Sequence, residues 1–130
     1  MSCSIKLYKL NEFIRKNETG EIDLKKSKHI IHELATAAAF NIESHILLDL
    51  RNTTLTSISF NTLMDVAIEF ARYRSVFRNK IANIIPDNPE RLFVAKQFKA
   101  ALNIQGFEFD YFTRIEDALE WFSDITELKS

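Results

Sequence analysis

Apolar and polar residues alternate at the start of the chain with the period of a β-strand. Residues 4–10 place successive side chains on two different faces, and residues 13–15 are interpreted as a short second strand. The polar segment 16–20 then ends at Gly20, a residue type that adopts a positive φ at little cost. We therefore expect a turn at residues 16–20, where the chain reverses its direction.

Helical spacing replaces this alternation after Asp23, whose carboxylate suits a helix start because it can accept a hydrogen bond from an otherwise unpaired amide. The predicted helix runs to about Phe40, and its buried stripe consists of Leu24, Ile31, Leu34, Ala35 and Ala38. Residues 45–50 form a nearly continuous apolar run, which is typical of a central strand that is covered on both faces. The polar residues 51–57 are expected to be the exit loop of that strand.

A second helix is predicted from about Ser59 to Tyr73, and the side chains that it turns inward are Leu63, Met64, Ala67, Ile68 and Ala71. Residues 80–85 indicate another buried strand. It ends at Pro86, because proline has no N–H group to donate to a ladder. We expect the two apolar runs, 45–50 and 80–85, to lie side by side in the middle of one sheet.

Asn88 and the proline after it mark a third helix over residues 89–103, since proline is favoured at the first helical position. Its inward side chains are Leu92, Phe93, Ala95, Phe98, Ala101 and Leu102. Residues 107–112 alternate as a further strand, and Thr113 with Glu116 forms a capping box ahead of a closing helix. That helix turns inward Ile115, Ala118, Leu119 and Phe122.

The order of these elements is β-β-α-β-α-β-α-β-α, with short connections between them. Such alternation predicts an α/β fold in which right-handed crossovers join parallel strands. We expect residues 1–130 to form a single domain with one mixed, mostly parallel sheet of about five strands, flanked by about four helices.

Composition and charge narrow the classes of function. The chain has 17 basic and 18 acidic side chains, and a net charge of −1 supplies no field to hold a polyanion, so nucleic acid is not an expected partner. No apolar run approaches the roughly 20 residues of a membrane-spanning helix, and the start has no signal-peptide pattern. Cys3 is the only cysteine, which excludes an internal disulfide. A cytoplasmic protein without a membrane span is expected.

Three short strings resemble the STAS and SpoIIAA-like family: GEID at residues 20–23, ILLDLR at 46–51 and IEDALEWF at 115–122. The last is similar to the terminal helix of the SpoIIAA-like branch, which shares its architecture with the CRAL-TRIO lipid carriers. The resemblance implies a non-enzymatic regulatory or docking module. Some members are switched by phosphorylation of a serine at the start of the helix after the middle strand.

The matching stretch here is SISF at residues 57–60, which places Ser59 at the phosphoacceptor position. Ser57 stands where those members have an acid, and Phe60 stands where they have a glycine. A phosphate on Ser59 would meet the free amides of a helix N-terminus. The alternative is that Ser57 or Ser59 is simply an N-cap.

Polar residues gather after the predicted strands, at the edge where ligands of such sheets usually bind. The candidate partner- or ligand-binding residues are Asp49, Arg51, Asn52, Thr54, Ser57, Asn61, Thr62, Asp87 and Asn88. The first hypothesis is that the loop and helix after the central strand dock a protein partner. The alternative is a carrier or sensor of a small or lipidic ligand, favoured by the 11 Phe residues and by the lipid-carrier side of the resemblance. A Phe-rich surface also favours self-association into a homodimer.

Catalysis, a cofactor and a bound metal are not expected. The sequence has no Gly-x-Ser-x-Gly elbow and no glycine-rich phosphate loop. His29 and His32 have a helical spacing that would place two imidazoles near one metal, but the neighbouring lysines indicate a solvated helix face instead.

Overall fold

The computed structural model describes residues 4–9, 13–56 and 59–129, with side chains described between residues 13 and 123. Four strands form one sheet in the order β2-β3-β4-β5, and every neighbouring pair is parallel. The strands are β2 (Phe13–Ile22), β3 (His45–Leu55), β4 (Ile81–Ile84) and β5 (Phe109–Phe112). The predicted α/β class is therefore confirmed, and the sheet has four strands where about five were expected.

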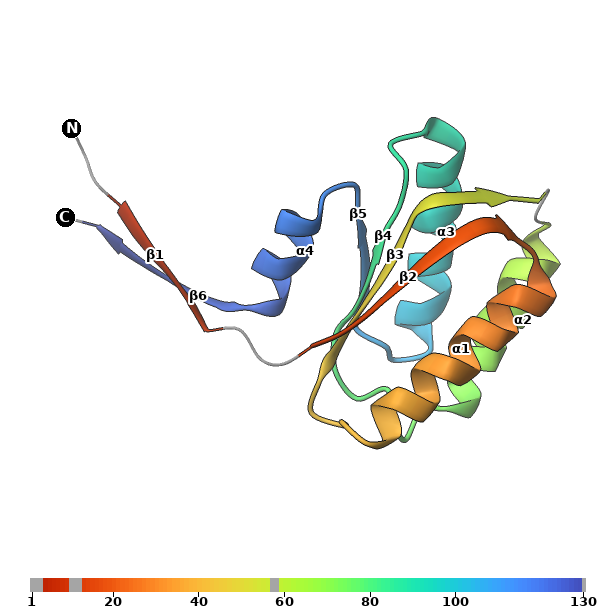
Figure 1. Ribbon diagram of the computed structural model, residues 1–130, viewed down its shortest axis with the longest axis horizontal. Helices are drawn as coiled ribbons and strands as arrows, with labels where there is room; N and C mark the ends of the chain where they lie inside the picture. Colours follow the sequence, from red (N-terminus) through yellow and green to blue (C-terminus); the bar gives the residue numbers. More distant parts are fainter. Residues whose placement is uncertain (1–3, 10–12, 57–58, 130) are drawn as a thin grey trace.

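Three helices join consecutive strands of this sheet, and a fourth follows the last strand. They are α1 (Leu24–Ala39), α2 (Phe60–Arg72), α3 (Pro89–Ile104) and α4 (Ile115–Phe122). Helices α1, α2 and α3 cover one face of the sheet, and α4 lies on the other face (Figure 1). Crossovers of one hand place their helices on one face when successive strands are added in the same direction, which is the arrangement found here.

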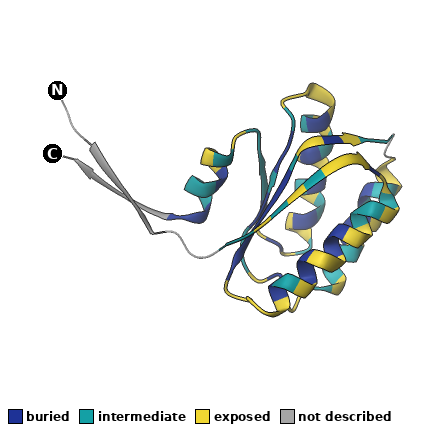
Figure 2. Ribbon diagram, viewed as in Figure 1, coloured by how far each residue is buried: buried dark blue, intermediate teal, exposed yellow. Residues whose placement is uncertain are grey.

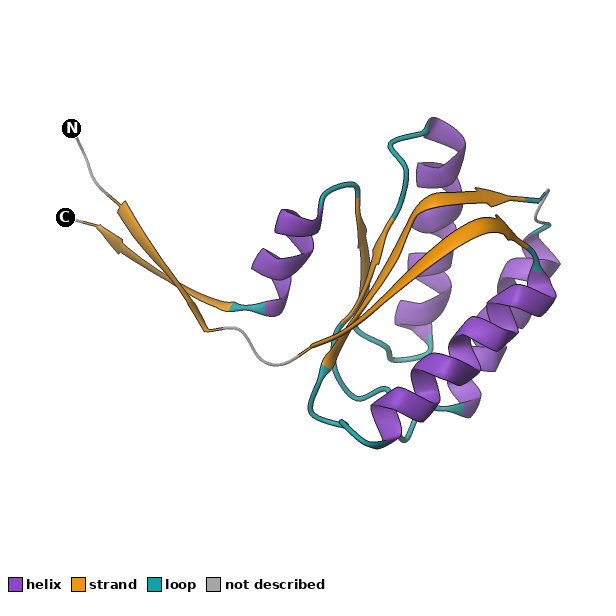
Figure 3. Cartoon of the chain, in the orientation of Figure 1, coloured by secondary structure: helices purple, strands orange, loops and turns teal. Residues whose placement is uncertain are grey.

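The first and last strands form a separate pair. β1 (Ser4–Lys9) is antiparallel to β6 (Asp124–Lys129), and this two-stranded sheet extends away from the four-stranded one (Figures 1 and 3). The prediction of a strand at residues 4–10 is confirmed, apart from its last residue, which lies outside the described part of the chain. Its expected place in the main sheet is wrong, and β6 was not predicted.

The turn predicted at residues 16–20 is wrong, and the loop predicted at 51–57 is wrong for residues 51–55, because both segments belong to paired strands. Thr56 follows the strand, and Ser57 lies outside the described residues. β2 continues through Gly20 (φ 84°) to Ile22, parallel to β3 and without a reversal. β3 likewise continues to Leu55. Edge strand β2 exposes one side to water, so polar side chains are tolerated while the backbone groups pair with β3.

A β-bulge interrupts the pairing of these two strands. Asn17 pairs with Asp49 but Thr19 pairs with Asn52, so β3 carries one extra residue at this point. Side chains alternate between the faces of a strand, and an extra residue reverses the alternation that follows it. The buried Thr53 is therefore on the face that is covered by α1, α2 and α3.

Buried apolar side chains form one cluster on each face of the sheet. Figure 2 marks the buried residues in dark blue along the ribbon. Ile46 and Leu48 of β3 belong to the larger cluster, under α1, α2 and α3. Leu47 belongs to the smaller one, with Ala82, Ile84, Ala118 and Phe122 under α4. The prediction of a central strand that is covered on both faces is confirmed.

The predicted inward faces are confirmed for α1 and α4 and partly wrong for α2 and α3. In α1, Ile31, Leu34, Ala35 and Ala38 are buried together with Ile30, and in α4 Ala118 and Phe122 are buried while Ile115 and Leu119 are half-buried against them. In α2, Ile68 is 51% exposed, whereas Val66 and Phe70 are buried. In α3, Phe93 is 61% exposed and Arg91 is buried. Both helices carry a second apolar stripe, and only contacts with the neighbouring helices decide which stripe faces inward.

Three of the predicted helix caps are confirmed. The side chain of Asp23 accepts from the Lys26 amide at 2.7 Å, and Ser59 and Asn88 cap α2 and α3. The capping box of Thr113 and Glu116 is wrong, because α4 begins after Arg114 and has no side-chain cap. Its start is one residue later than expected, so Thr113 lies outside the helix.

Candidate ligand-binding cavity

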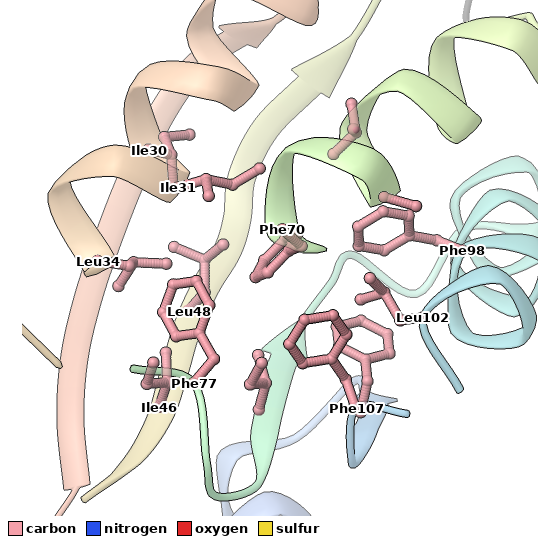
Figure 4. Packing of buried hydrophobic residues seen from close by; sticks show 14 of the residues in the cluster. Ile30, Ile31, Leu34, Ile46, Leu48, Phe70, Phe77, Phe98, Leu102 and Phe107 are labelled. Atoms are coloured by element: carbon pink, nitrogen blue, oxygen red, sulfur yellow. The ribbon is translucent and has the colours of Figure 1, made fainter. Parts of the chain in front are cut away.

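A cavity of about 110 Å³ lies between the four-stranded sheet and helices α1, α2 and α3. Its walls are mainly apolar: Leu48, Leu50 and Leu55 come from β3, and the helices add Ile30, Ile31, Leu63, Val66, Phe70, Val94, Ala95 and Phe98. Figure 4 shows Ile31, Leu48, Phe70 and Phe98 projecting from α1, β3, α2 and α3 into the layer between helices and sheet. Water therefore has few polar groups to bind in this space.

The cavity lies toward the carboxyl ends of the parallel strands. Its lining includes Ile22, the last residue of β2, and Ile85, which directly follows β4. Ser27 and Arg91, from the beginnings of α1 and α3, line it as well. Ligands of open α/β sheets usually bind at this end of the strands.

Arg91 is the charged residue of the cavity wall, and its side chain is held by β3. It is 9% exposed, and it donates from Nη1 to the carbonyl oxygen of Thr53 at 2.7 Å and from Nη2 to Thr53 Oγ1 at 2.9 Å. Within the described residues, no carboxylate forms an ion pair with Arg91. Burial lowers the pKa of Arg91, because the charged guanidinium has lost water.

The position of Arg91 follows from local structure on both sides. Asn88 Oδ1 accepts from the Arg91 amide at 3.2 Å, which fixes the first turn of α3. On the sheet side, the bulge turns Thr53 toward α3, and Thr53 Oγ1 donates to the Leu50 carbonyl at 2.6 Å. The guanidinium thus rests on a hydroxyl and a carbonyl that are themselves held in place.

Asn83 is the second polar group of the cavity wall, in the middle of β4. Its Oδ1 atom is buried and has no hydrogen-bond partner. An amide that loses its hydrogen bonds to water on burial costs about 1–3 kcal/mol when nothing replaces them. The Asn83 side chain therefore contributes a buried oxygen that no other group of the described structure satisfies.

Asp49 and Arg51, which the sequence suggested as site residues, lie away from this cavity. Asp49 is buried on the face that carries α4, two residues after Leu47. It accepts hydrogen bonds from Arg51 Nη2 at 2.7 Å and Nε at 3.0 Å, and it forms an ion pair with Arg15 at 3.4 Å. The Arg51 hydrogen bond lowers the pKa of Asp49 against the opposing effect of burial. This carboxylate is already neutralised by its own neighbours.

The other predicted site residues do not converge on one point. Asn52, Thr54, Asn61, Asp87 and Asn88 are exposed, Thr62 is half-buried, and Ser57 lies outside the described residues. Ser59 is the N-cap of α2: its Oγ accepts from the Thr62 amide at 3.2 Å and lies 3.0 Å from Thr62 Oγ1. Of this set, Asn88 acts on the cavity, through the first turn of α3.

The sequence carries a clear signal for Asn83 and only a weak one for Arg91. Asn83 interrupts the otherwise apolar run Ile81 to Ile85, which is unusual for a buried strand. Arg91 lies three residues after a cap, between Glu90 and Leu92, and arginine is mostly a surface residue and is normally interpreted as one.

The histidine pair on α1 has other partners. His29 Nε2 contacts Glu33, and His32 Nδ1 lies 3.2 Å from the Tyr73 hydroxyl. Across the described segments of the chain, no group of three or more His, Cys, Asp and Glu side chains is arranged to hold a metal ion. None of the helices there is both long and apolar enough to span a bilayer.

Comparisons with known proteins identify no relative, so the fold and the geometry of the site are the guide to function. No family model, curated protein or solved structure matches this chain. The fold defines an α/β protein with a parallel four-stranded sheet, and the site is an apolar cavity with a buried arginine in its wall.

Proposed function

We propose that this protein is a non-enzymatic binding module that takes a small, mainly apolar ligand into the cavity between the sheet and helices α1, α2 and α3. One observation carries the proposal: Arg91, 9% exposed, lines an apolar cavity and has no carboxylate partner in the described structure. A buried charge without a counter-charge is costly, and strongly perturbed charged groups are concentrated at functional sites.

The size and lining of the cavity suit binding rather than chemistry. A dry cavity of roughly 150 Å³ in another protein holds benzene, so the smaller volume of about 110 Å³ accommodates part of a short apolar chain. The polar side chains among the described lining residues are Ser27, Asn83 and Arg91. This set has no carboxylate, imidazole or thiol to serve as a general base or activated nucleophile.

A cavity-filling substitution tests the proposal. Ala95 is buried in the cavity wall, and Ala100 is exposed on the same helix, so Ala95→Leu and Ala100→Leu make the same change inside and outside the cavity. Native mass spectrometry of fresh protein and thermal shifts with short apolar ligands should show binding for wild type and Ala100→Leu only. Equal binding by Ala95→Leu, with its fold verified by circular dichroism, would place any ligand elsewhere and contradict the proposal.

Docking of a protein partner is a second candidate function, favoured by the outward face of α2. Phe60 is 67% exposed and Ile68 is 51% exposed, two helical turns apart and with the half-buried Met64 between them. Large apolar side chains that line up on one helix face are typical of a surface for another protein. The cap and first turn, with Ser59 and Asn61, border this face.

Matched phenylalanine substitutions test the docking candidate. Phe60→Glu should abolish binding to a purified partner, and Ser59→Glu and Asn61→Lys should weaken it. Phe93→Glu is the control, because Phe93 is similarly exposed but lies on α3. Sedimentation velocity on the same variants would reveal a homodimer through this face. Binding that is unaffected by all three α2 changes would argue against docking.

Membership of the STAS and SpoIIAA-like family, with Ser59 as phosphoacceptor, remains a proposal. The parallel sheet of an α/β fold and the exposed position of Ser59 at the start of α2 support it. Incubation with serine kinases followed by peptide mapping tests it, and peptides that contain Ser59 without any label would count against it.

A further inference from the structure

We propose that the ligand of the cavity is a monocarboxylate with a short apolar tail, whose head group binds Arg91 and Asn83. This inference rests on the proposed function, because it concerns the same cavity. It follows from the guanidinium donors that Arg91 does not use within the protein, from the positive charge in the cavity wall, and from the Asn83 Oδ1 atom without a hydrogen-bond partner.

Arg91 has donors available for a ligand. A guanidinium has five N–H groups, and Arg91 uses two of them on Thr53 at 2.7 and 2.9 Å. The remaining donors have no acceptor within the described residues. A carboxylate suits a guanidinium because its two oxygens accept parallel hydrogen bonds, and such charge-assisted bonds are about twice as strong as neutral ones.

The charge balance of the cavity favours a singly charged anion. Arg91 brings one positive charge and the other described lining residues bring none. A carboxylate neutralises it, whereas a phosphate monoester brings about −1.5 to −2 and would leave buried negative charge. An amine would place a second cation beside the guanidinium, and a neutral alcohol would leave it unpaired.

Asn83 supplies the second polar contact. Its Oδ1 has no partner, and an amide turned by half a rotation presents its NH₂ group in place of its oxygen. It can therefore donate to the carboxylate or accept from a hydroxyl on the ligand. The remaining walls, with Leu48 and Val94 among them, bind the apolar tail.

The geometry is set before any ligand arrives. Arg91 is fixed by the Asn88 cap at one end and by Thr53 at the other, so little side-chain entropy remains to be lost on binding. Such a preorganised guanidinium should discriminate between head groups more strongly than a mobile surface arginine.

Calorimetric titration with hexanoate, hexanol and hexylamine tests the inference on the intact chain. Wild-type protein should bind hexanoate about tenfold or more tightly than hexanol, and hexylamine most weakly, since charge-assisted hydrogen bonds are about twice as strong as neutral ones. Arg91→Met should remove the preference for hexanoate, so that hexanoate binds no more tightly than hexanol. Asn83→Leu should weaken hexanoate binding by a smaller factor.

The outcomes separate the two proposals. If hexanol binds wild type and Ala100→Leu but not Ala95→Leu, the cavity is a ligand site. Hexanol or hexylamine binding as tightly as hexanoate would then overturn the head-group inference alone. If none of the three compounds binds wild type, the proposed function fails as well. The wild-type comparison needs no substitution at Arg91, so it decides the matter even if Arg91→Met does not fold.

Discussion

Asn79 and Asn83 are four residues apart and their amides have opposite environments. Asn79 Nδ2 donates to the carbonyl oxygen of Ile42 at 2.9 Å and to that of Ser44 at 3.5 Å. Asn83 Oδ1 is buried without a partner, at the wall of the cavity. A residue that serves a ligand rather than the fold should lower the stability of the empty protein.

Exchanging each amide for leucine, which has a similar shape, should have opposite effects on stability. Asn83→Leu should raise the free energy of unfolding by about 1 kcal/mol, because a buried amide oxygen without a hydrogen-bond partner is removed. Asn79→Leu should lower it by about 1 kcal/mol, because two carbonyl groups lose their donor. Urea denaturation measures both, and a loss of stability in Asn83→Leu as large as in Asn79→Leu would show that the Asn83 amide supports the fold.

Asp49 links the stability of the protein to pH. Hydrogen bonds from Arg51 lower its pKa in the folded protein, whereas an aspartate in the unfolded chain titrates near about 3.9. A lowered folded-state pKa stabilises the protein above the unfolded-state value. This contribution disappears as the pH falls through the folded-state pKa.

Removing the Asp49 carboxylate should make the free energy of unfolding depend less on pH in acid. Below about pH 4, the free energy of unfolding should fall less steeply with acidification in Asp49→Asn than in wild type. Arg51→Met should give the same change, and the double variant should add little, because both remove one interaction. Urea titrations at several pH values measure the slopes, and parallel slopes for wild type and both variants would contradict this assignment.

Helix starts were predictable because a cap is a local feature. Asp23, Ser59 and Asn88 each satisfy amides of their own first helical turn, so their role depends on little else in the fold. Thr113 was misassigned, because the exact start of α4 depends on its packing against β4 and β5.

Ser59 offers a direct measurement of one cap. Ser59→Ala should lower the free energy of unfolding by about 1 kcal/mol, because the Thr62 amide loses its acceptor. Ser59→Asp should keep wild-type stability, because a carboxylate accepts the same bond and favours a helix N-terminus. Thermal or urea denaturation separates the two, and equal losses in both variants would mean that the cap contributes nothing.

Residue spacing alone did not predict which face of α2 is buried. Leu63, Val66 and Phe70 form one apolar stripe, and Phe60, Met64 and Ile68 form another. The first faces the sheet because α2 lies between α1 and α3, a non-local arrangement that local periodicity does not contain.

Matched isoleucine substitutions test which face of α2 is buried. Ile68→Ala on the exposed side of α2 should change the free energy of unfolding by about 0.5 kcal/mol or less. Ile31→Ala in α1, where Ile31 is 2% exposed, should cost about 2–5 kcal/mol. Chemical denaturation compares them, and similar costs would mean that Ile68 is buried.

The arrangement of the sheet was partly predictable. Strands joined by helices were expected to be parallel, and β2 to β5 follow that rule in simple sequential order. The pairing of β1 with β6 joins the two ends of the chain, and the long pairing of β2 with β3 crosses segments with polar composition. Neither has a local signal, because strand partners are chosen by contacts far apart in sequence.

The cavity was located by this topology rather than by any motif. Parallel strands bring Ile22, Leu55 and Ile85 to one end, where the sequence predicted a ligand site. The residues that define its chemistry, Arg91 and Asn83, belong to a helix and a strand that both read as ordinary core elements.

Methyl NMR with added hexanoate tests the central claim most directly. Methyl groups of Ile30, Leu48 and Val94 line the cavity, whereas Ile42 is 37% exposed and Ile104 is 84% exposed. We predict saturable shifts of the three cavity residues and none at Ile42 or Ile104. Shifts confined to the two exposed residues, or no shift at any hexanoate concentration, would contradict the account.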